Sequence, residues 1–189
     1  VKFGQASYPR SRLRNANGTL GPVLSAAFDS ETLTIATRHH PLVASKPHVS
    51  VLLSATREVL AKGFPEIEIQ SGLANRVLWA LVDRPRIDPD GGRVPEDDLR
   101  RRATALRRAI QAASKLGEVG RDAYAAALWR TEYERLDREQ PGRHGLVTAR
   151  ATTLVRRLAL IYAILGQSRV VTADHLRAAL DLWRYCDES

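Results

Sequence analysis

The stretch that decides the fold is Leu146–Leu165, which reads LVTARATTLVRRLALIYAIL. Its apolar side chains return every three or four positions, at Leu154, Leu158, Ile161 and Leu165. This is the period of an amphipathic helix, and the glycine that follows is a typical helix stop. The stretch therefore predicts a long helix that faces a core with Leu154, Leu158, Ile161, Tyr162 and Leu165.

The same helical period recurs on both sides of this stretch. One segment begins at Pro95 with three acids, which favour a helix start, and continues with an apolar stripe at Leu99, Ala103, Leu106, Ile110 and Ala113. A second covers Asp122–Arg138, and a third begins at Thr172, a typical N-cap residue. Residues 91–189 are therefore expected to form a helical part of about four helices.

The N-terminal half has shorter, more β-like patterns. After an irregular lead-in, Val1–Asn17, we expect a helix over Thr19–Asp29 and a short strand at Leu33–Ile35. Val49–Leu53 and Val77–Val82 are apolar runs of strand length and are predicted to be buried strands. The remaining expectations are a loop between Pro41 and Pro47, a short helix over Ala55–Lys62, a helical turn at Ser71–Arg76 and a boundary loop at Asp83–Val94.

These patterns predict an α+β fold that is predominantly α. Residues 1–90 would form a partial α/β core with few strands, and residues 91–189 a helical domain. The composition excludes a collagen, a disulfide scaffold and a wholly disordered chain. No apolar run reaches the roughly 20 residues of a membrane span, so no membrane partner is expected. The lone cysteine, Cys186, excludes an internal disulfide and favours a cytoplasmic setting.

Charge is distributed unevenly along the chain. The whole sequence has 29 Lys+Arg against 21 Asp+Glu, a net charge of +8. Residues 99–189 hold 17 basic and 10 acidic side chains, whereas residues 51–98 hold 6 basic and 9 acidic ones. A basic half favours an anionic partner such as DNA. The alternative is a solvated, arginine-rich surface of a protein from a GC-rich genome.

Motifs of self-sufficient active sites are missing from the sequence. It contains no G-x-x-x-x-G-K-[S/T] phosphate loop, no G-x-S-x-G, no C-x-x-C and no H-E-x-x-H. His39 and His40 are adjacent, so a helix could not turn both toward one metal ion. We therefore predict no metal site in this chain.

An ordered set of segments carries a resemblance to a known family. In chain order these are NGTLGPVL and AFD within 17–29, HVSVLLSAT at 48–56, GLANRVLWALVDRP at 72–85, ARATTLVRRLALIYAIL at 149–165 and the V-T-x-x-H-L segment from 171. The set resembles the C-terminal half of a P-loop ATPase family found in plasmid, phage and mobile-element replication proteins, often behind primase–polymerase modules. More distantly, residues 71–83 and 148–161 are similar to the arginine-finger strand and the lid helix of minichromosome-maintenance helicases.

The resemblance implies a role for four residues. Arg76 would be the finger that reaches a neighbouring subunit's nucleotide, and Arg150 the lid arginine at a γ-phosphate. Ser54 or Thr56 would lie near the first sensor position, at the end of a central strand. The alternatives are a solvated Arg76 at a strand start, a surface or ion-paired Arg150, and a helix cap at Thr56.

Arginines of the helical part are candidates for contact with DNA. They are Arg101, Arg107, Arg108 and Arg157; a solvated helix face is the alternative.

The resemblance implies ATP and Mg²⁺ as cofactors of the full-length family. In that family the phosphate loop and the acidic strand that binds the metal precede the region matched here. No cofactor is therefore expected in this chain alone. The first residue, Val1, and the lack of methionine fit a fragment that needs an upstream ATPase half or a homo-oligomer and is inactive alone. The alternative function is a stand-alone basic helical module for nucleic-acid binding, regulation or oligomerisation.

Overall fold

A computed structural model of the chain describes residues 20–35, 41–64, 66–83, 89 and 92–189. The chain divides into two compact units. Unit 1 comprises residues 1–77 and 141–147, and unit 2 comprises residues 78–140 and 148–189. The division therefore falls earlier than the expected boundary loop, and a short later segment joins unit 1. The lead-in Val1–Asn17 and the pair His39–His40 lie outside the described residues.

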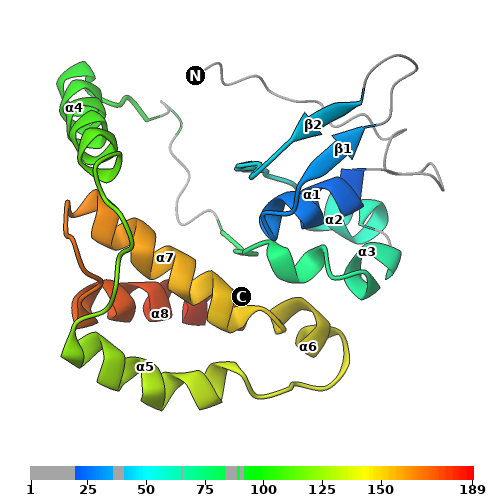
Figure 1. Cartoon of the computed structure of the whole chain (residues 1–189). Coiled ribbons are helices and arrows are strands. Elements are labelled where there is room, and N and C mark those ends of the chain that lie inside the picture. The colour runs from blue at the N-terminus through cyan, green and yellow to red at the C-terminus, as the bar shows by residue number, and fades with distance from the viewer. Residues whose placement is uncertain (1–19, 36–40, 65, 84–88, 90–91) are drawn as a thin grey trace. The chain divides into compact units, whose positions relative to one another are not determined.

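Unit 1 combines short helices with one small sheet (Figure 1). Strands β1 (Leu33–Ile35) and β2 (Leu42–Ala44) pair antiparallel, with Thr34 opposite Val43. The helices, in chain order, are α1 (Leu20–Phe28), α2 (Arg57–Gly63), α3 (Glu66–Gln70), the 3₁₀ turn η1 (Ala74–Arg76) and α6 (Gly142–Thr148), whose last residue belongs to unit 2. The predicted helix at 19–29 is confirmed over Leu20–Phe28, with Thr19 outside the described residues, and the predicted strand at 33–35 is confirmed. Buried residues of this unit include Ala27, Ile69, Leu73 and Ala74.

Two expectations about strands in this region are wrong. The loop predicted between Pro41 and Pro47 contains β2, which forms because β1 offers it a partner. In contrast, Val49–Leu53 and Val77–Val82 are irregular, and Leu52 is 93% exposed. A strand needs a neighbour for its backbone hydrogen bonds, and among the described residues neither run has one. The described part of the chain therefore holds a two-stranded sheet, and a P-loop core remains a proposal.

Unit 2 contains four helices, as the sequence predicts for the C-terminal half, but the predicted helix Leu146–Leu165 is divided, because α6 ends at Thr148 and α7 begins at Ala151. The four helices are α4 (Glu96–Ala113), α5 (Ala123–Leu136), α7 (Ala151–Leu165) and α8 (Ala173–Glu188). Helix α7 packs along α8, α5 contacts both, and α4 contacts α7 (Figure 1). The α+β, predominantly α fold class is thus confirmed.

Local signals explain where these helices begin. The Asp122 carboxylate accepts a hydrogen bond from the Ala125 N–H at 2.7 Å and caps α5. Thr172 caps α8 in a capping box in which His175 occupies the position that Glu or Gln usually takes. Arg121 and Val171 form a short parallel bridge that brings these two helix starts together.

The core of unit 2 is made mainly of small and branched residues. Val155, Ala159 and Ala163 of α7 are buried, as are Leu176, Ala179 and Leu180 of α8. The predicted inward face of α7 is partly wrong, because Ile161 and Leu165 are about half exposed. The alanines lie one position further along the chain than the large apolar residues, and their small side chains allow close helix contact.

Helix α4 is much more exposed than its pattern suggests. Leu99, Leu106 and Ile110 of the expected apolar stripe are 53%, 51% and 60% exposed, and Ala109 is the buried residue of the helix. The buried position of α4 therefore lies beside the expected stripe and not on it. None of the helices in the described residues has the length and apolar character to cross a membrane.

Candidate functional site

The segment Gly72–Arg76 forms a tight turn in unit 1. Gly72 has φ = +83°, a conformation that glycine adopts with little cost. The turn folds the chain so that Arg76 Nη1 donates to the Gly72 carbonyl at 2.7 Å. A Cβ at Gly72 would lie 2.9 Å from this nitrogen. The glycine therefore serves both the backbone turn and the close approach of the arginine.

The Arg76 guanidinium is held by α1. Nη2 and Nε donate to Asp29 Oδ2 at 2.5 and 3.2 Å, and Cζ lies 5.9 Å from the Phe28 ring centroid. The arginine side chain is 13% exposed, and the Asp29 side chain 26%. Arg76 thus occupies a 3₁₀ turn instead of a strand start, and its contacts link η1 to α1. The finger role stays a prediction.

Asn75 extends this cluster toward residues 141–147. Its Nδ2 donates to the Leu146 carbonyl at 3.2 Å, and Glu66 forms an ion pair with Arg143 at 2.8 Å. These contacts attach the later segment to unit 1. Asn75 Oδ1 is buried and has no hydrogen-bond partner among the described residues, which is costly for a carbonyl oxygen.

The predicted sensor residues lie at the start of α2. Thr56 is its N-cap, because Oγ1 accepts from the Val59 N–H at 3.3 Å. A backbone hydrogen bond, and then the hydrogen bond with Thr56, lower the pKa of Glu58 in the first turn. Ser54 is exposed in the irregular segment before the helix. The capping role of Thr56 is therefore visible, whereas a sensor role for Ser54 or Thr56 stays a prediction.

Arg150 stands at the N-terminal boundary of α7 in unit 2. Its carbonyl accepts from the Leu154 N–H at 3.0 Å, while its side chain makes no capping hydrogen bond. The residue is partly exposed. Arg76 and Arg150 belong to different units, and the predicted lid role of Arg150 also stays a prediction.

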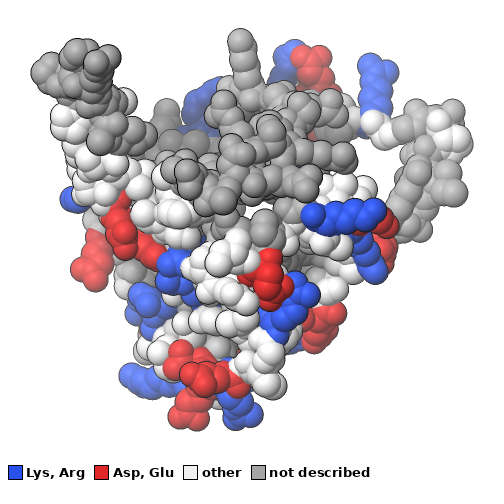
Figure 2. Space-filling model, turned by 90° about the vertical axis from the view of Figure 1, so that its right-hand side faces the viewer, with Lys and Arg blue, Asp and Glu red and all other residues white. Residues whose placement is uncertain are grey.

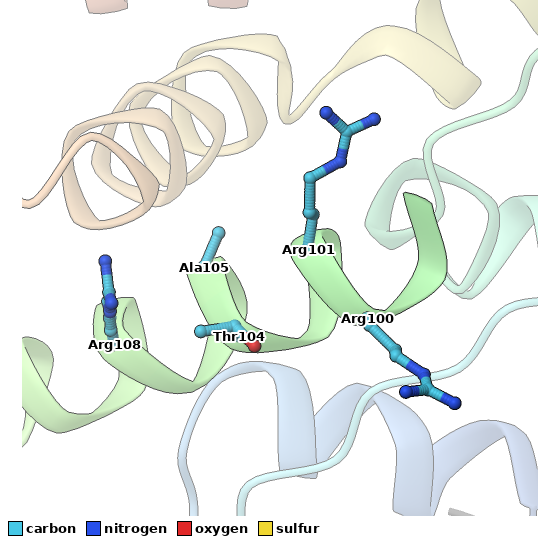
Figure 3. A pocket seen from close by; sticks show the side chains of 5 residues that line it. All are labelled: Arg100, Arg101, Thr104, Ala105 and Arg108. Carbon is cyan, nitrogen blue, oxygen red and sulfur yellow. The ribbon is translucent and has the colours of Figure 1, made fainter. Parts of the chain in front are cut away.

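The predicted DNA-binding arginines all lie on exposed helix surface of unit 2. Arg101, Ala105 and Arg108 point to one side of α4, whereas Arg100 points the opposite way (Figure 3). Together with Thr104 they line a shallow hollow along the helix. Arg107 is exposed on the same helix, and Arg157 is exposed on α7.

Many arginines elsewhere are paired with acids of their own helix. Arg135 pairs with Glu132, Arg177 with Asp174 and Arg184 with Asp181, each three residues away. Figure 2 shows basic and acidic side chains intermingled on one face of the molecule. On α4 itself, Arg100 pairs with Glu96 and Arg101 with Asp98. Charge alone is therefore a poor guide to which arginines bind a partner.

Arg121 has a contact in unit 2 that the sequence patterns do not reveal. Arg121 Cζ lies over the Trp129 ring, 4.8 Å from its centroid. Burial, followed by the nearby charge of Arg156, lowers the pKa of Arg121. Arg121 and Arg156 are 35 positions apart, in a linker and in α7, so no local motif connects them. In the sequence, the one feature that marks Arg121 is its position directly before an N-cap residue and eight residues before Trp129.

Neither the comparisons with known proteins nor the arrangement of potential metal ligands assigns a function to these residues. No family model, curated protein or solved structure matches the chain. Within the described residues, no group of three or more His, Cys, Asp and Glu side chains is arranged to hold a metal ion.

Proposed function

We propose that unit 2 is a nucleic-acid-binding module and that α4 is its contact element. The observation that carries this proposal is the charge of one exposed segment. Between Leu99 and Gly117 the chain has six basic residues and no acid. Because a nucleic-acid backbone is uniformly anionic, a segment of this kind attracts it irrespective of base sequence.

Unpaired arginines on α4 support the proposal. Among the described residues, Arg102, Arg107 and Arg108 have no carboxylate partner, in contrast to the paired arginines of α8. A guanidinium without an internal partner keeps its donors available for phosphate oxygens, which it binds with planar geometry.

The spacing on α4 also suits an extended anion. Arg101 and Arg108 form a row on α4, because they are seven residues apart, close to two helical turns, and Lys115 follows the end of the helix. The two arginines are therefore separated by about 10 Å along the axis. Arg101 and Arg108 point to the same side (Figure 3). A row of this kind follows a phosphate backbone rather than a single small anion.

The setting that the resemblance implies is a replication-associated P-loop NTPase. In that setting the chain is a C-terminal part that contributes Arg76 and Arg150 to a site whose ATP and Mg²⁺ are bound by an upstream half or a neighbouring subunit. Arg76 would have to exchange Asp29 for a phosphate. Arg76→Ala and Arg150→Ala in a family member that contains the phosphate loop should lower ATP turnover; unchanged turnover in both variants would remove this role.

Fluorescence anisotropy with a short labelled DNA duplex and the matching single strand tests the binding proposal. The wild-type chain should bind both, and its affinity should fall steeply with salt. Arg107→Gln/Arg108→Gln should weaken duplex binding at least about threefold at low salt. If each arginine contacts one phosphate, the slope of log affinity against log salt should decrease by roughly 2.

The matched control is Arg177→Gln/Arg184→Gln on α8. It removes the same charge from exposed arginines that already have carboxylate partners. It should leave the salt slope close to that of the wild type. Equal losses in the two double variants would mean that net charge, and not α4, governs binding. Failure of the wild type to bind either DNA at low salt would exclude the function.

A further inference from the structure

The apolar stripe of α4 faces outward and is separate from the arginine row on the same helix. Leu99, Leu106 and Ile110 are each more than half exposed, whereas Ala109, the sequence neighbour of Ile110, is buried. Arg108 of the row is two residues from both Leu106 and Ile110, and is therefore roughly 160° away around the helix axis. The function proposed above thus leaves the stripe unused.

The spacing of the stripe is typical of a contact between two helices. Its members are separated alternately by four and three residues and are Leu99, Ala103, Leu106, Ile110 and Ala113. This is the a/d pattern of a heptad repeat, which forms a narrower seam than the face by which a helix packs on a core. Helices that lie in a lipid interface usually have Trp or Phe on the apolar face, and α4 has no aromatic residue. A second helix is therefore the occupant that fits this α4 seam.

Basic side chains flank the α4 seam on both sides. With Ala103 and Ile110 at heptad positions a, Arg102 lies at position g and Arg107 at position e. Both arginines are exposed, and among the described residues neither forms an ion pair. Side chains at e and g face the other helix and determine which helices can pair.

These flanks exclude a second copy of α4 as a favourable occupant. In a parallel pair, Arg102 would lie beside Arg107 of the other copy, because a g position is next to the following e position of its neighbour. In an antiparallel pair, e positions meet e positions, which in α4 are Arg100 and Arg107. Both orientations bring like charges together, whereas acidic side chains at the same positions would attract the arginines.

We infer that the α4 seam binds an amphipathic helix of another protein, and that the apolar stripe of this helix is flanked by Asp or Glu. Ala103 and Ala113 leave space for large apolar side chains of the partner between Leu99, Leu106 and Ile110. The acidic flanks would pair with Arg102 and Arg107. Because the seam and the arginine row are on different faces, this inference does not depend on DNA binding.

Fluorescence anisotropy with labelled synthetic peptides tests the charge of the partner. The acidic probe has three heptads with Leu at positions a and d and Glu at e and g, and the basic probe differs in having Lys at e and g. At low salt the wild-type chain should bind the acidic probe at least about fivefold more tightly, because opposite charges at e and g select the partner. Equal affinities, or binding of neither probe, would overturn the proposal.

A charge-neutral variant tests whether the seam is the binding surface. Leu106→Gln/Ile110→Gln removes apolar area at exposed positions and should weaken binding of the acidic probe at least about tenfold. The control Leu52→Gln/Leu53→Gln removes two exposed leucines of unit 1 and should keep the affinity within about twofold. Far-UV circular dichroism checks that both variants stay folded. Equal affinities of the two variants would contradict the inference, and unchanged DNA binding by the seam variant would separate it from the function proposed above.

The flanking arginines have their own variant. Arg102→Gln/Arg107→Gln should reduce the preference for the acidic over the basic probe by at least about threefold. The control Arg177→Gln/Arg184→Gln removes the same charge from α8 and should keep the preference. The same preference in both double variants would mean that net charge, and not the flanks of the seam, selects the peptide.

Two measurements address the other possible occupants. Sedimentation equilibrium reports self-association, and co-sedimentation with phosphatidylcholine vesicles that contain phosphatidylserine reports lipid binding. The wild type and Leu106→Gln/Ile110→Gln should behave alike in both. A wild-type dimer that this variant abolishes would assign the seam to a second copy, and vesicle binding that it abolishes would assign the seam to a lipid surface. Either result would overturn the proposal.

Discussion

The guanidinium of Arg76 donates two hydrogen bonds to the carboxylate of Asp29, at 2.5 and 3.2 Å, across 47 residues of sequence. Both side chains are largely shielded from water, at 13% and 26% exposure. A shielded, charge-assisted contact of this kind contributes more to folding than the exposed pairs on α8. The pair therefore links the last turn of α1 to η1.

Removal of this contact should destabilise unit 1. Arg76→Ala should lower the free energy of unfolding by about 1–3 kcal/mol, because it removes two charge-assisted hydrogen bonds to Asp29 and the packing on Phe28. Urea unfolding followed by far-UV circular dichroism measures the change. In a double-mutant cycle with Asp29→Asn, the two effects should be strongly non-additive. Additive effects would show that the contact contributes nothing to stability.

Gly72 should be sensitive to the addition of a single methyl group. Gly72→Ala should cost about 1–2 kcal/mol, because a Cβ is disfavoured at φ = +83°. The new Cβ would also lie 2.9 Å from Arg76 Nη1. Gly117→Ala is the control, since a Cβ there meets nothing within 4 Å. Equal midpoints of urea unfolding for the two variants would contradict the proposed role of the turn.

Alanine substitutions of two leucines compare the buried core with the exposed apolar stripe of α4. Leu176→Ala should destabilise the chain by about 2–5 kcal/mol, because this side chain is 1% exposed at the contact of α7 with α8. Leu106→Ala, at a position that is 51% exposed, should change stability by less than about 1 kcal/mol. Thermal unfolding compares them. A loss at Leu106 as large as that at Leu176 would mean that the α4 stripe is covered in solution.

Cys186 should react slowly with thiol reagents in the folded protein. Burial raises the pKa of the thiol, so less thiolate is present at a given pH than in an unstructured peptide. Alkylation by iodoacetamide should therefore need a higher pH than in urea. Because the folded pKa is raised, the favourable contribution of the protonated thiol is complete below its unfolded pKa and is lost as pH rises through the folded pKa. Equal rates in buffer and in urea at mildly alkaline pH would refute this.

The sequence predicted the helices better than the strands for a physical reason. The bonds that form α7 and α8 connect residues four apart, so the local apolar period is sufficient to predict both helices, although α7 begins at Ala151 and not at Leu146. A strand depends on a distant partner. The runs at Val49–Leu53 and Val77–Val82 have strand composition but no such partner among the described residues, whereas the short β2 has one in β1.

The contacts around the candidate residues could not be predicted from local patterns. The sequence pattern singles out Gly72–Arg76, but it predicts Asp29, the partner of Arg76, only as the end of a helix. The contact of Arg121 with Trp129 likewise depends on how the segment before α5 folds back on that helix. Helix periodicity gives the face of each helix but not the pairing of faces, and that pairing decides which charges meet.

The division of the chain has a consequence for the order of events during biosynthesis. Unit 1 needs residues 141–147, which supply the Leu146 carbonyl to Asn75 and Arg143 to Glu66. A ribosome synthesises these residues only after the whole of α4 and α5. The first 77 residues are therefore synthesised well before residues 141–147, and part of their surface stays uncovered until α4 and α5 of the other unit have been synthesised. No uninterrupted piece of the gene encodes unit 1 alone, so recombination cannot transfer it as a single block.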